Sequence, residues 1–331
     1  MKAYVLPAIV LLASTACSQG ANSGPWRPNR PVEFIVAAGP GGGSDGLART
    51  VQAIVQKHRL LDTAVIVTNK GGGAGSEAFV YAKGAAGDPH KLVFATNNVW
   101  LLPLGTAVGY KSSDLRPVAS MAVDEFVLWV KADAPYRDVA GFIGAARKGS
   151  RLSVAGTQAK DTDQVLVRQI EKTAGVGFTY VPFRSGSEVA VQLAGGHVAA
   201  NVNNPQENLA QWRAGAVRPL CVFAPQRLSY TEGMTGSVSW ADVPTCKEAG
   251  LPIDRYQMPR TVWLPAGVTD EQVEFYRTLL ARVRETEEWK TWLRNGSQTD
   301  MFMSGPQLAE YIASDERWLR EQFMQDGWLV N

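Results

Sequence analysis

Short apolar runs and stretches with helical spacing follow one another along most of this chain. Residues 31–38 form an apolar run rich in β-branched side chains, and residues 47–56 carry apolar side chains at helical spacing. A glycine-rich turn at 39–46 joins the two. Units of strand, turn and helix build parallel sheets, so the pattern predicts an α/β protein.

The same alternation recurs up to about residue 264. We expect strands at 31–38, 63–68, 91–95, 125–130, 152–155, 177–181, 197–202, 218–223 and 256–264. We expect helices between them at 47–56, 76–82, 136–147, 162–173, 188–193 and 205–212. The pattern then changes to helix alone, at 269–285, 287–294 and 305–326. Such a tail has no sheet of its own and must pack on an existing domain.

The turns at the strand ends fall into two sets, one before about residue 124 and one after it. Ligands of open α/β sheets bind beyond the carboxyl ends of the strands. Two α/β lobes that face each other across a ligand cleft therefore account for both sets. The boundaries predict one lobe from 31–124 plus 257–331 and a second from 125–256.

The N-terminus has the features of an export signal. Lys2 supplies a positive charge, residues 5–13 are apolar, and residues 14–16 form a small-residue cleavage signature. We expect residues 1–16 to be a signal peptide, since the apolar run is too short to span a membrane. The mature protein is then exported to the periplasm.

Cys17 directly follows the expected cleavage point and leaves two forms open. The protein is either released after cleavage or lipid-anchored through an acylated Cys17. Residues 17–30, with two prolines, then form an N-terminal tether before the first strand.

Composition narrows the class of partner. The formal net charge is +2, which gives no support for binding to nucleic acid. Cys221 and Cys246 remain after export, and an oxidising compartment allows them to form a disulfide. Two separate buried thiols fit the sequence equally well.

The glycine-rich turn at 39–46 is the strongest indication of a binding site. It presents free backbone N–H groups next to the positive end of a helix dipole, which is a geometry that binds anions. Other polar residues gather at strand ends where they could converge on the same cleft. In the first lobe they are Ser44, Asp45, Thr96, Asn97 and Asn98; in the second they are Thr157, Gln158, Lys160, Asp161, Arg184, Ser185, Ser187, Asn203 and Asn204. About half of such residues would serve only as turn formers and helix caps.

Two catalytic or cofactor motifs also match the turn. Residues 41–46 fit the dinucleotide pattern G-x-G-x-x-G, but the second strand ends in Thr68-Asn69-Lys70 without the acidic residue that holds a ribose. Ser44 fits the nucleophile position G-x-S-x-G of a secreted serine hydrolase. None of the three histidines follows His197, so the late histidine of that fold is missing.

Histidine, cysteine and acid spacings indicate no metal site. We therefore expect a binding protein without cofactor, metal or catalytic residues, with the hydrolase as the alternative.

Several runs together resemble the extracytoplasmic solute receptors of tripartite tricarboxylate transporters, the Bug family. The similarity covers the mature chain in order, through Pro31-Val-Glu-Phe-Ile-Val36, Gly39-Pro-Gly-Gly-Gly-Ser-Asp-Gly-Leu-Ala-Arg49, Val67-Thr-Asn-Lys-Gly-Gly-Gly-Ala-Gly75, Tyr180-Val-Pro-Phe-Arg-Ser-Gly186, Leu193-Ala-Gly-Gly-His-Val198, Arg213-Ala-Gly-Ala-Val-Arg-Pro-Leu220, Asp242-Val-Pro-Thr-Cys-Lys-Glu-Ala-Gly-Leu251 and Leu264-Pro-Ala-Gly-Val-Thr269.

This resemblance implies a fold like that of type II periplasmic binding proteins, with two lobes joined by crossing strands that close on a ligand. It implies a small organic anion as ligand, a carboxylate above all, and membrane components of the transporter as partners. We expect a monomer; a ligand sensor of the same fold is a further alternative. The implied ligand-binding residues are Gly41, Gly42, Gly43, Ser44, Asp45, Thr96, Asn97, Thr157, Gln158, Arg184, Ser185, Gly186, Ser187 and Asn203.

The chain departs from the family pattern within this set. The family often has Pro-Phe where this chain has Ala37-Ala38, and an Asp where Asn203 stands. The loop at 156–163 is also more charged than usual. Lys160 in this loop could bind a distal carboxylate, but we expect it to pair with Asp161 or Asp163.

Overall fold

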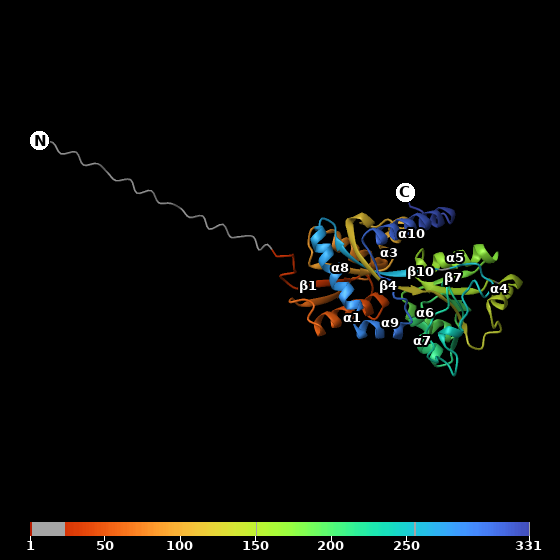
Figure 1. Cartoon of the computed structure of the whole chain (residues 1–331). Helices are drawn as coiled ribbons and strands as arrows, with labels where there is room; N and C mark the ends of the chain where they lie inside the picture. Colours follow the sequence, from red (N-terminus) through yellow and green to blue (C-terminus); the bar gives the residue numbers. More distant parts are fainter. Residues whose placement is uncertain (2–23, 150, 255, 331) are drawn as a thin grey trace.

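Two sheets, each covered by helices, form two lobes that lie side by side (Figure 1). This computed structural model describes Met1 and residues 24–330 apart from 150 and 255. The predicted signal peptide beyond Met1 and the predicted lipidation at Cys17 lie outside the described residues. The α/β architecture with two lobes confirms the predicted fold class.

The first lobe contains a six-stranded mixed sheet. Its strands are β1 (Val32–Val36), β2 (Val65–Asn69), β3 (Lys91–Ala95), β4 (Leu115–Glu125), β10 (Gln257–Pro265) and β11 (Met303–Ser304). Their order is β11-β4-β10-β3-β1-β2. β1 is parallel to β2 and β3, whereas β10 is antiparallel to β3 and β4.

The second lobe contains a five-stranded sheet. Its strands are β5 (Val127–Lys131), β6 (Ser153–Thr157), β7 (Thr179–Phe183), β8 (Ala200–Asn201) and β9 (Val217–Val222). Their order is β7-β6-β8-β5-β9, and β5 is antiparallel to both β8 and β9. Purely parallel sheets, as the alternating pattern predicts, are therefore wrong for both lobes. The antiparallel strands are those that carry the chain between the lobes or lie beside them.

Helices pack on both sheets. They are α1 (Gly43–Lys57), α2 (Ser76–Lys83), α3 (Asn98–Gly105), α4 (Val139–Lys148), α5 (Thr162–Ala174), α6 (Gly186–Ala194), α7 (Pro205–Arg213), α8 (Asp270–Arg284), α9 (Glu287–Gly296) and α10 (Gly305–Gln325), with short 3₁₀ turns η1 (Gly72–Gly75), η2 (Ser112–Asp114) and η3 (Trp240–Asp242). The expected tail of helices is present as α8 to α10, interrupted by the two-residue β11.

The hydrophobic pattern of the sequence does not predict α3 and β4, and the reason can be identified for each. α3 is apolar on nearly all sides and contains Pro103, so it has no polar face to reveal its period. β4 precedes the predicted strand at 125–130, which corresponds to β5, and it contains Pro117, which argues against a strand. β4 is also buried along most of its length, so apolar and polar positions do not alternate.

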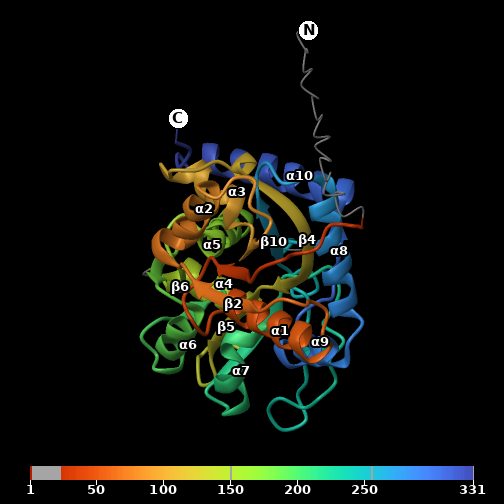
Figure 2. The same cartoon turned by 90° about the vertical axis from the view of Figure 1, so that its left-hand side faces the viewer.

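The chain passes twice between the lobes. β4 ends at Glu125 and β5 begins at Val127, while β10 begins at Gln257 on the return. Figure 2 shows β4 and β10 side by side, beneath α10. Lys172 Nζ of α5 lies 3.0 Å from Oδ1 of Asp326, a residue that directly follows α10. The C-terminal helix therefore also contacts the second lobe.

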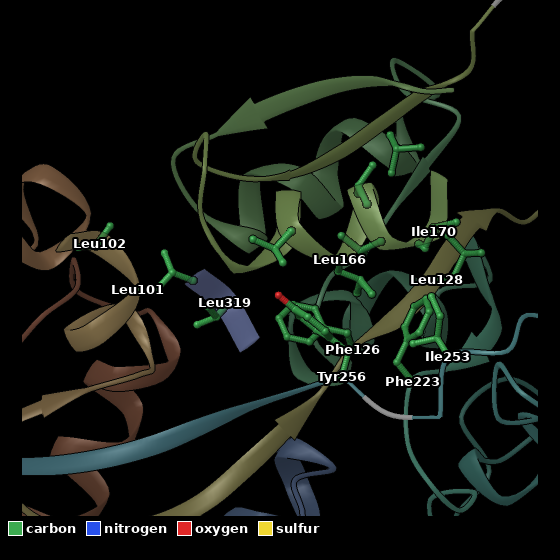
Figure 3. Packing of buried hydrophobic residues seen from close by; sticks show 14 of the residues in the cluster. Leu101, Leu102, Phe126, Leu128, Leu166, Ile170, Phe223, Ile253, Tyr256 and Leu319 are labelled. Atoms are coloured by element: carbon green, nitrogen blue, oxygen red, sulfur yellow. The ribbon is translucent and has the colours of Figure 1, made fainter. Parts of the chain in front are cut away.

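One apolar cluster extends through both lobes. Leu101 of α3 and Leu319 of α10 belong to the same buried cluster as Leu166 of α5 and Tyr256. Figure 3 shows these side chains along the boundary between α3, α10 and α5. The two crossing strands are therefore not the only connection, since apolar side chains of both lobes pack together beside them.

Cys221 and Cys246 form a disulfide with a Cα–Cα distance of 4.8 Å, so of the two open alternatives the disulfide is correct and the two separate thiols are not.

Near the N-terminus, the ring of Trp26 packs edge-on against the ring of Phe275, with 5.3 Å between the ring centroids, so part of the predicted tether is attached to α8. Within the described residues, the helices are all too short or too polar to cross a membrane.

Candidate functional site

A cavity of about 240 Å³ lies between the two lobes at the carboxyl ends of several strands. From the first lobe it is lined by Ala37, Ala38, Gly39, Pro40, Gly42, Gly43, Ser44, Gly71, Ala74, Thr96, Asn98, Met258 and Arg260. From the second lobe it is lined by Thr157, Gln158, Asp161, Thr162, Asp163, Arg184, Ser185, Gly186, Asn204 and Glu207. The two predicted sets of polar strand-end loops therefore meet at one cavity.

The glycine-rich turn forms one wall of the cavity. α1 begins at Gly43 after the N-cap Gly42, and no side chain caps this end. The first N–H groups of the helix are therefore available to an anion in the cavity. Gly71 packs closely against the turn, because a Cβ atom there would lie 2.7 Å from the backbone of Ala38.

Asp45 fixes the shape of this turn from within. Its carboxylate accepts hydrogen bonds from the Gly41 N–H at 2.9 Å, from Asn69 Nδ2 at 2.9 Å and from Arg49 Nε. Burial alone would raise the pKa of Asp45, but the hydrogen bonds from Arg49, Gly41 and Asn69 hold the pKa below its usual value. Asp45 does not line the cavity, so its role in this structure is to position the loop.

Substituting Asp45 by alanine is expected to lower the free energy of unfolding by about 1 to 2 kcal/mol, because the Gly41 and Asn69 donors lose a charged acceptor. The variant should also bind ligand more weakly although the removed group does not face the cavity. Chemical denaturation and calorimetric titration of the same sample measure the two effects. Unchanged affinity in a destabilised variant would show that the loop keeps its shape without this carboxylate.

Arg260 lies directly beneath the first turn of α1. Its side chain is buried, pairs with Asp124 and donates a hydrogen bond to Ser44 Oγ at 3.4 Å. A Cβ atom on Gly43 would lie 2.2 Å from the guanidinium, so a larger residue there would force Arg260 to move. Sequence reasoning missed Arg260, although a single charge inside the apolar run at 256–264 is a signal that could have revealed it.

The loop after β6 forms the opposite wall and is conformationally strained. Gln158 and Lys160 adopt left-handed backbone angles, with φ of 51° and 57°, which is uncommon for residues other than glycine. Tyr180 holds the loop by donating hydrogen bonds to the carbonyl oxygens of Thr157 and Gln158, at 2.8 and 2.9 Å. Backbone strain of this kind collects at ligand-binding sites.

Lys160 itself lies outside the cavity lining, and among the described residues its hydrogen bond is made by its backbone N–H, which donates to Gln164 Oε1 at 2.7 Å. The expected pairing of Lys160 with Asp161 or Asp163 is therefore wrong. Both acids instead accept hydrogen bonds from backbone N–H groups, Asp163 from Thr157 at 2.7 Å and Asp161 from Thr162 at 2.8 Å.

Three acidic residues of the second lobe also face the cavity: Asp161, Asp163 and Glu207. Burial raises the pKa of Asp161. Burial, with the neighbouring charges of Glu207 and Asp161, raises the pKa of Asp163 well above its usual value. Burial also raises the pKa of Glu207 to about 7, although Arg260 lowers it in part.

These acids come from the starts of two helices. Asp161 is the N-cap of α5 and Glu207 completes a capping box with Asn204 at the start of α7. The sequence Asn204-Pro-Gln-Glu207 shows the cap, but nothing in it shows that the carboxylate faces a cavity.

The structure brings most of the predicted ligand-binding residues to the cavity. Those that line it are Gly42, Gly43, Ser44, Thr96, Thr157, Gln158, Arg184, Ser185 and Gly186. Those that do not are Gly41, Asp45, Asn97, Ser187 and Asn203. Ligand contact by any member of the two sets stays a prediction.

Two of the residues outside the lining have other partners. Asn203 is fully buried and donates to the Gly186 carbonyl oxygen at 2.7 Å. Asn97 accepts a hydrogen bond from Thr162 Oγ1 at 3.1 Å, which links the lobes. It also lines a larger cavity of about 470 Å³ between α5 and α10. We place the candidate site in the smaller cavity because the glycine turn, Arg260 and the second-lobe loops converge there.

The serine hydrolase alternative finds no support. The Ser44 hydroxyl accepts a hydrogen bond from Arg260, which is a permanent cation and cannot act as the base that removes the serine proton. His58 contacts Glu288 and His90 contacts Asp88, and no histidine lines the cavity within the described part of the chain.

Comparison with known proteins agrees with this geometry. A family model described as the tripartite tricarboxylate transporter family receptor matches residues 47–323. A protein of Cupriavidus necator named UPF0065 protein in gbd 5′region is 25% identical, over 86% of this chain and 84% of that protein. The protein BugT of Bordetella pertussis is 27% identical, over 75% of this chain and 74% of that protein.

Solved structures show the same architecture. A TctC solute-binding protein from Polaromonas, without ligand, has 25% identity and a TM-score of 0.71, with 90% of this chain and 99% of that chain covered. The Rpa4515 protein of R. palustris with adipate has 24% identity and a TM-score of 0.81, covering 91% and 98%. The periplasmic binding protein BugD has 18% identity and a TM-score of 0.78, covering 92% and 100%.

The fold and the cavity between its lobes define a two-lobed solute-binding protein. The chain belongs to the receptor family of the tripartite tricarboxylate transporters. The predicted resemblance to the Bug-type receptors is thereby confirmed.

Proposed function

We propose that this receptor binds a small organic carboxylate in the cavity between its lobes and delivers it to the membrane components of its transporter. The observation that carries the proposal is the start of α1, where no side chain caps the helix and the residues from Gly42 to Ser44 line the cavity together with Arg260. Such a helix end, with a neighbouring guanidinium, binds carboxylate oxygens through charge-assisted hydrogen bonds. Two structures with this fold carry adipate and malate.

The remaining parts of the proposal concern location, assembly and motion. The receptor acts in the periplasm as a monomer, either free or anchored through an acylated Cys17. Residues 31–124 with 257–331 and residues 125–256 form the two lobes, which close on the ligand by bending where β4 and β10 cross between them.

Replacing Arg184 by alanine should weaken carboxylate binding about tenfold or more, equivalent to at least about 1.4 kcal/mol. Arg184 is exposed, lines the cavity, and only its backbone N–H has a hydrogen-bond partner in the described structure. Its loss should therefore leave folding stability within about 0.5 kcal/mol. Calorimetric titration with mono-, di- and tricarboxylates measures the effect.

Arg213→Ala is a matched control, because this exposed arginine lies in the same lobe but outside the cavity lining. It should bind the carboxylates like the unmodified protein. Thermal melting first selects the ligands, since a ligand at a hundred times its dissociation constant adds about 2.7 kcal/mol to stability. If no carboxylate raises the melting temperature, the proposed function fails.

A further inference from the structure

The cavity holds more negative than positive side chains, which is unexpected for a site that binds anions alone. Its ionisable lining consists of two arginines, Arg184 and Arg260, and three acids, Asp161, Asp163 and Glu207. Arg260 is already paired with Asp124, so the pair adds no net charge to the cavity, although the guanidinium can still donate hydrogen bonds to a ligand. If one carboxylate of a dicarboxylate lies at the start of α1, its second carboxylate would lie near the like-charged Asp163 and Glu207, which is unfavourable.

Each of these acids keeps one carboxyl oxygen free for another partner. Asp163 Oδ2 accepts from the Thr157 N–H at 2.7 Å and from its Oγ1 at 3.0 Å. Glu207 Oε2 accepts from the Asn204 N–H at 3.1 Å. Within the described residues, nothing donates to Asp163 Oδ1 or Glu207 Oε1. Asp163 is nevertheless only 5% exposed and Glu207 is partly buried, and both line the cavity.

Helix capping explains why acids occur here but not why they are buried around a cavity. The positive ends of α5 and α7 favour a carboxylate by a modest amount. Removing a carboxylate from water costs considerably more unless a cation or several donors compensate it. The pKa values of Asp163 and Glu207 are raised although the helix ends and Arg260 are present, so burial outweighs those contributions.

The backbone holds the two acids in place. A Cβ atom on Gly186 would lie 2.0 Å from the Glu207 carboxyl group, so the start of α6 packs directly on it. A Cβ atom on Gly156 would lie 2.6 Å from Asp163 Cβ, so β6 packs directly on that residue. Both carboxyl groups are therefore packed against the backbone of the second lobe while they line the cavity, and a cation in the cavity would compensate their ionised forms.

We propose that the ligand carries a cationic nitrogen in addition to its carboxylate, and that Asp163 and Glu207 bind this nitrogen through their free carboxyl oxygens. The inference rests on the proposed function: the carboxylate lies at the start of α1 and the cationic nitrogen lies against the second lobe. An ammonium group has three donors and no acceptor, which matches two carboxylates with unused oxygens. The ligand class is a zwitterionic amino acid or an ω-amino acid, and a simple dicarboxylate is disfavoured.

Matched pairs of acids that differ only by an ammonium group test the proposal by calorimetric titration of the purified protein. The pairs are γ-aminobutyrate with butyrate, aspartate with succinate, glutamate with glutarate, and 6-aminohexanoate with hexanoate. In at least one pair we expect the aminated acid to bind about tenfold tighter or more, as a desolvated charge pair allows. Glu207→Gln and Asp163→Asn should each abolish this preference, while the exposed Glu232→Gln should keep it.

The outcomes separate this inference from the proposed function. If succinate, glutarate or another simple acid binds as tightly as its aminated partner in every pair, the inference is overturned and the carboxylate receptor stands. If the preference persists in both Glu207→Gln and Asp163→Asn, these residues do not bind the nitrogen and the inference is also overturned. If none of the acids binds, both proposals fail.

Discussion

Replacing Arg260 by methionine is expected to lower the free energy of unfolding by about 3 to 5 kcal/mol, because Asp124 would be left as an uncompensated buried charge. Both side chains are at most 7% exposed, and their ion pair joins β10 to β4, the two crossing strands. Gln298 also donates to Asp124 but carries no charge. Denaturant unfolding monitored by tryptophan fluorescence measures the loss.

The double substitution Arg260→Met with Asp124→Leu is the decisive control. It removes both charges, and replacement of a buried ion pair by apolar side chains is often close to neutral. We expect the double variant to recover most of the lost stability while still binding carboxylate poorly, since the cation beneath α1 is gone. A single Arg260→Met variant that loses less than about 1 kcal/mol would contradict this account, because it would mean that water reaches Asp124.

The parts of the site that could be predicted are those that a short, continuous stretch of sequence specifies by itself. A strand, a glycine-rich turn and an amphipathic helix at 31–56 specify the anion-binding helix start without any knowledge of the rest of the fold. The polar loops at Thr157 and Arg184 follow predicted strands in the same way, and both reach the cavity. Local rules suffice because each of these groups is placed by its own strand end.

Residues that depend on contacts far apart in sequence could not be predicted. Arg260 reaches Ser44 across 216 positions, and its pairing with Asp124 exists only because β10 and β4 are antiparallel neighbours. Glu207 belongs to an ordinary capping box in the sequence, and its place beside the cavity depends on how α6 packs against the start of α7. The local pattern thus fixes the anion-binding wall, whereas the net charge of the cavity follows from tertiary packing.

The unliganded protein should lose stability as the pH rises from about 4.5 to about 7, by up to about 3 kcal/mol from Glu207 alone. The pKa of Glu207 is raised from 4.5 to about 7 by burial, so the folded state keeps its proton in this window while the unfolded chain has released it. Stability falls with pH wherever the folded state binds more protons. Asp161 and Asp163 have raised pKa values and contribute in the same direction.

Glu207→Gln isolates this contribution, because glutamine has nearly the same shape and can still accept the Asn204 hydrogen bond at the start of α7. Carboxylates with lowered pKa values, such as Asp45 and Asp88, lose their stabilising effect only at lower pH, so they do not mask the effect. Denaturant unfolding at several pH values should show a smaller decline for the variant, and its advantage over the parent should grow as pH increases. Parallel curves for the two proteins would mean that Glu207 is solvated and titrates normally.

A saturating aminated ligand should suppress the decline of stability with pH in the parent protein. A cation beside Glu207 stabilises the ionised carboxylate that burial disfavours.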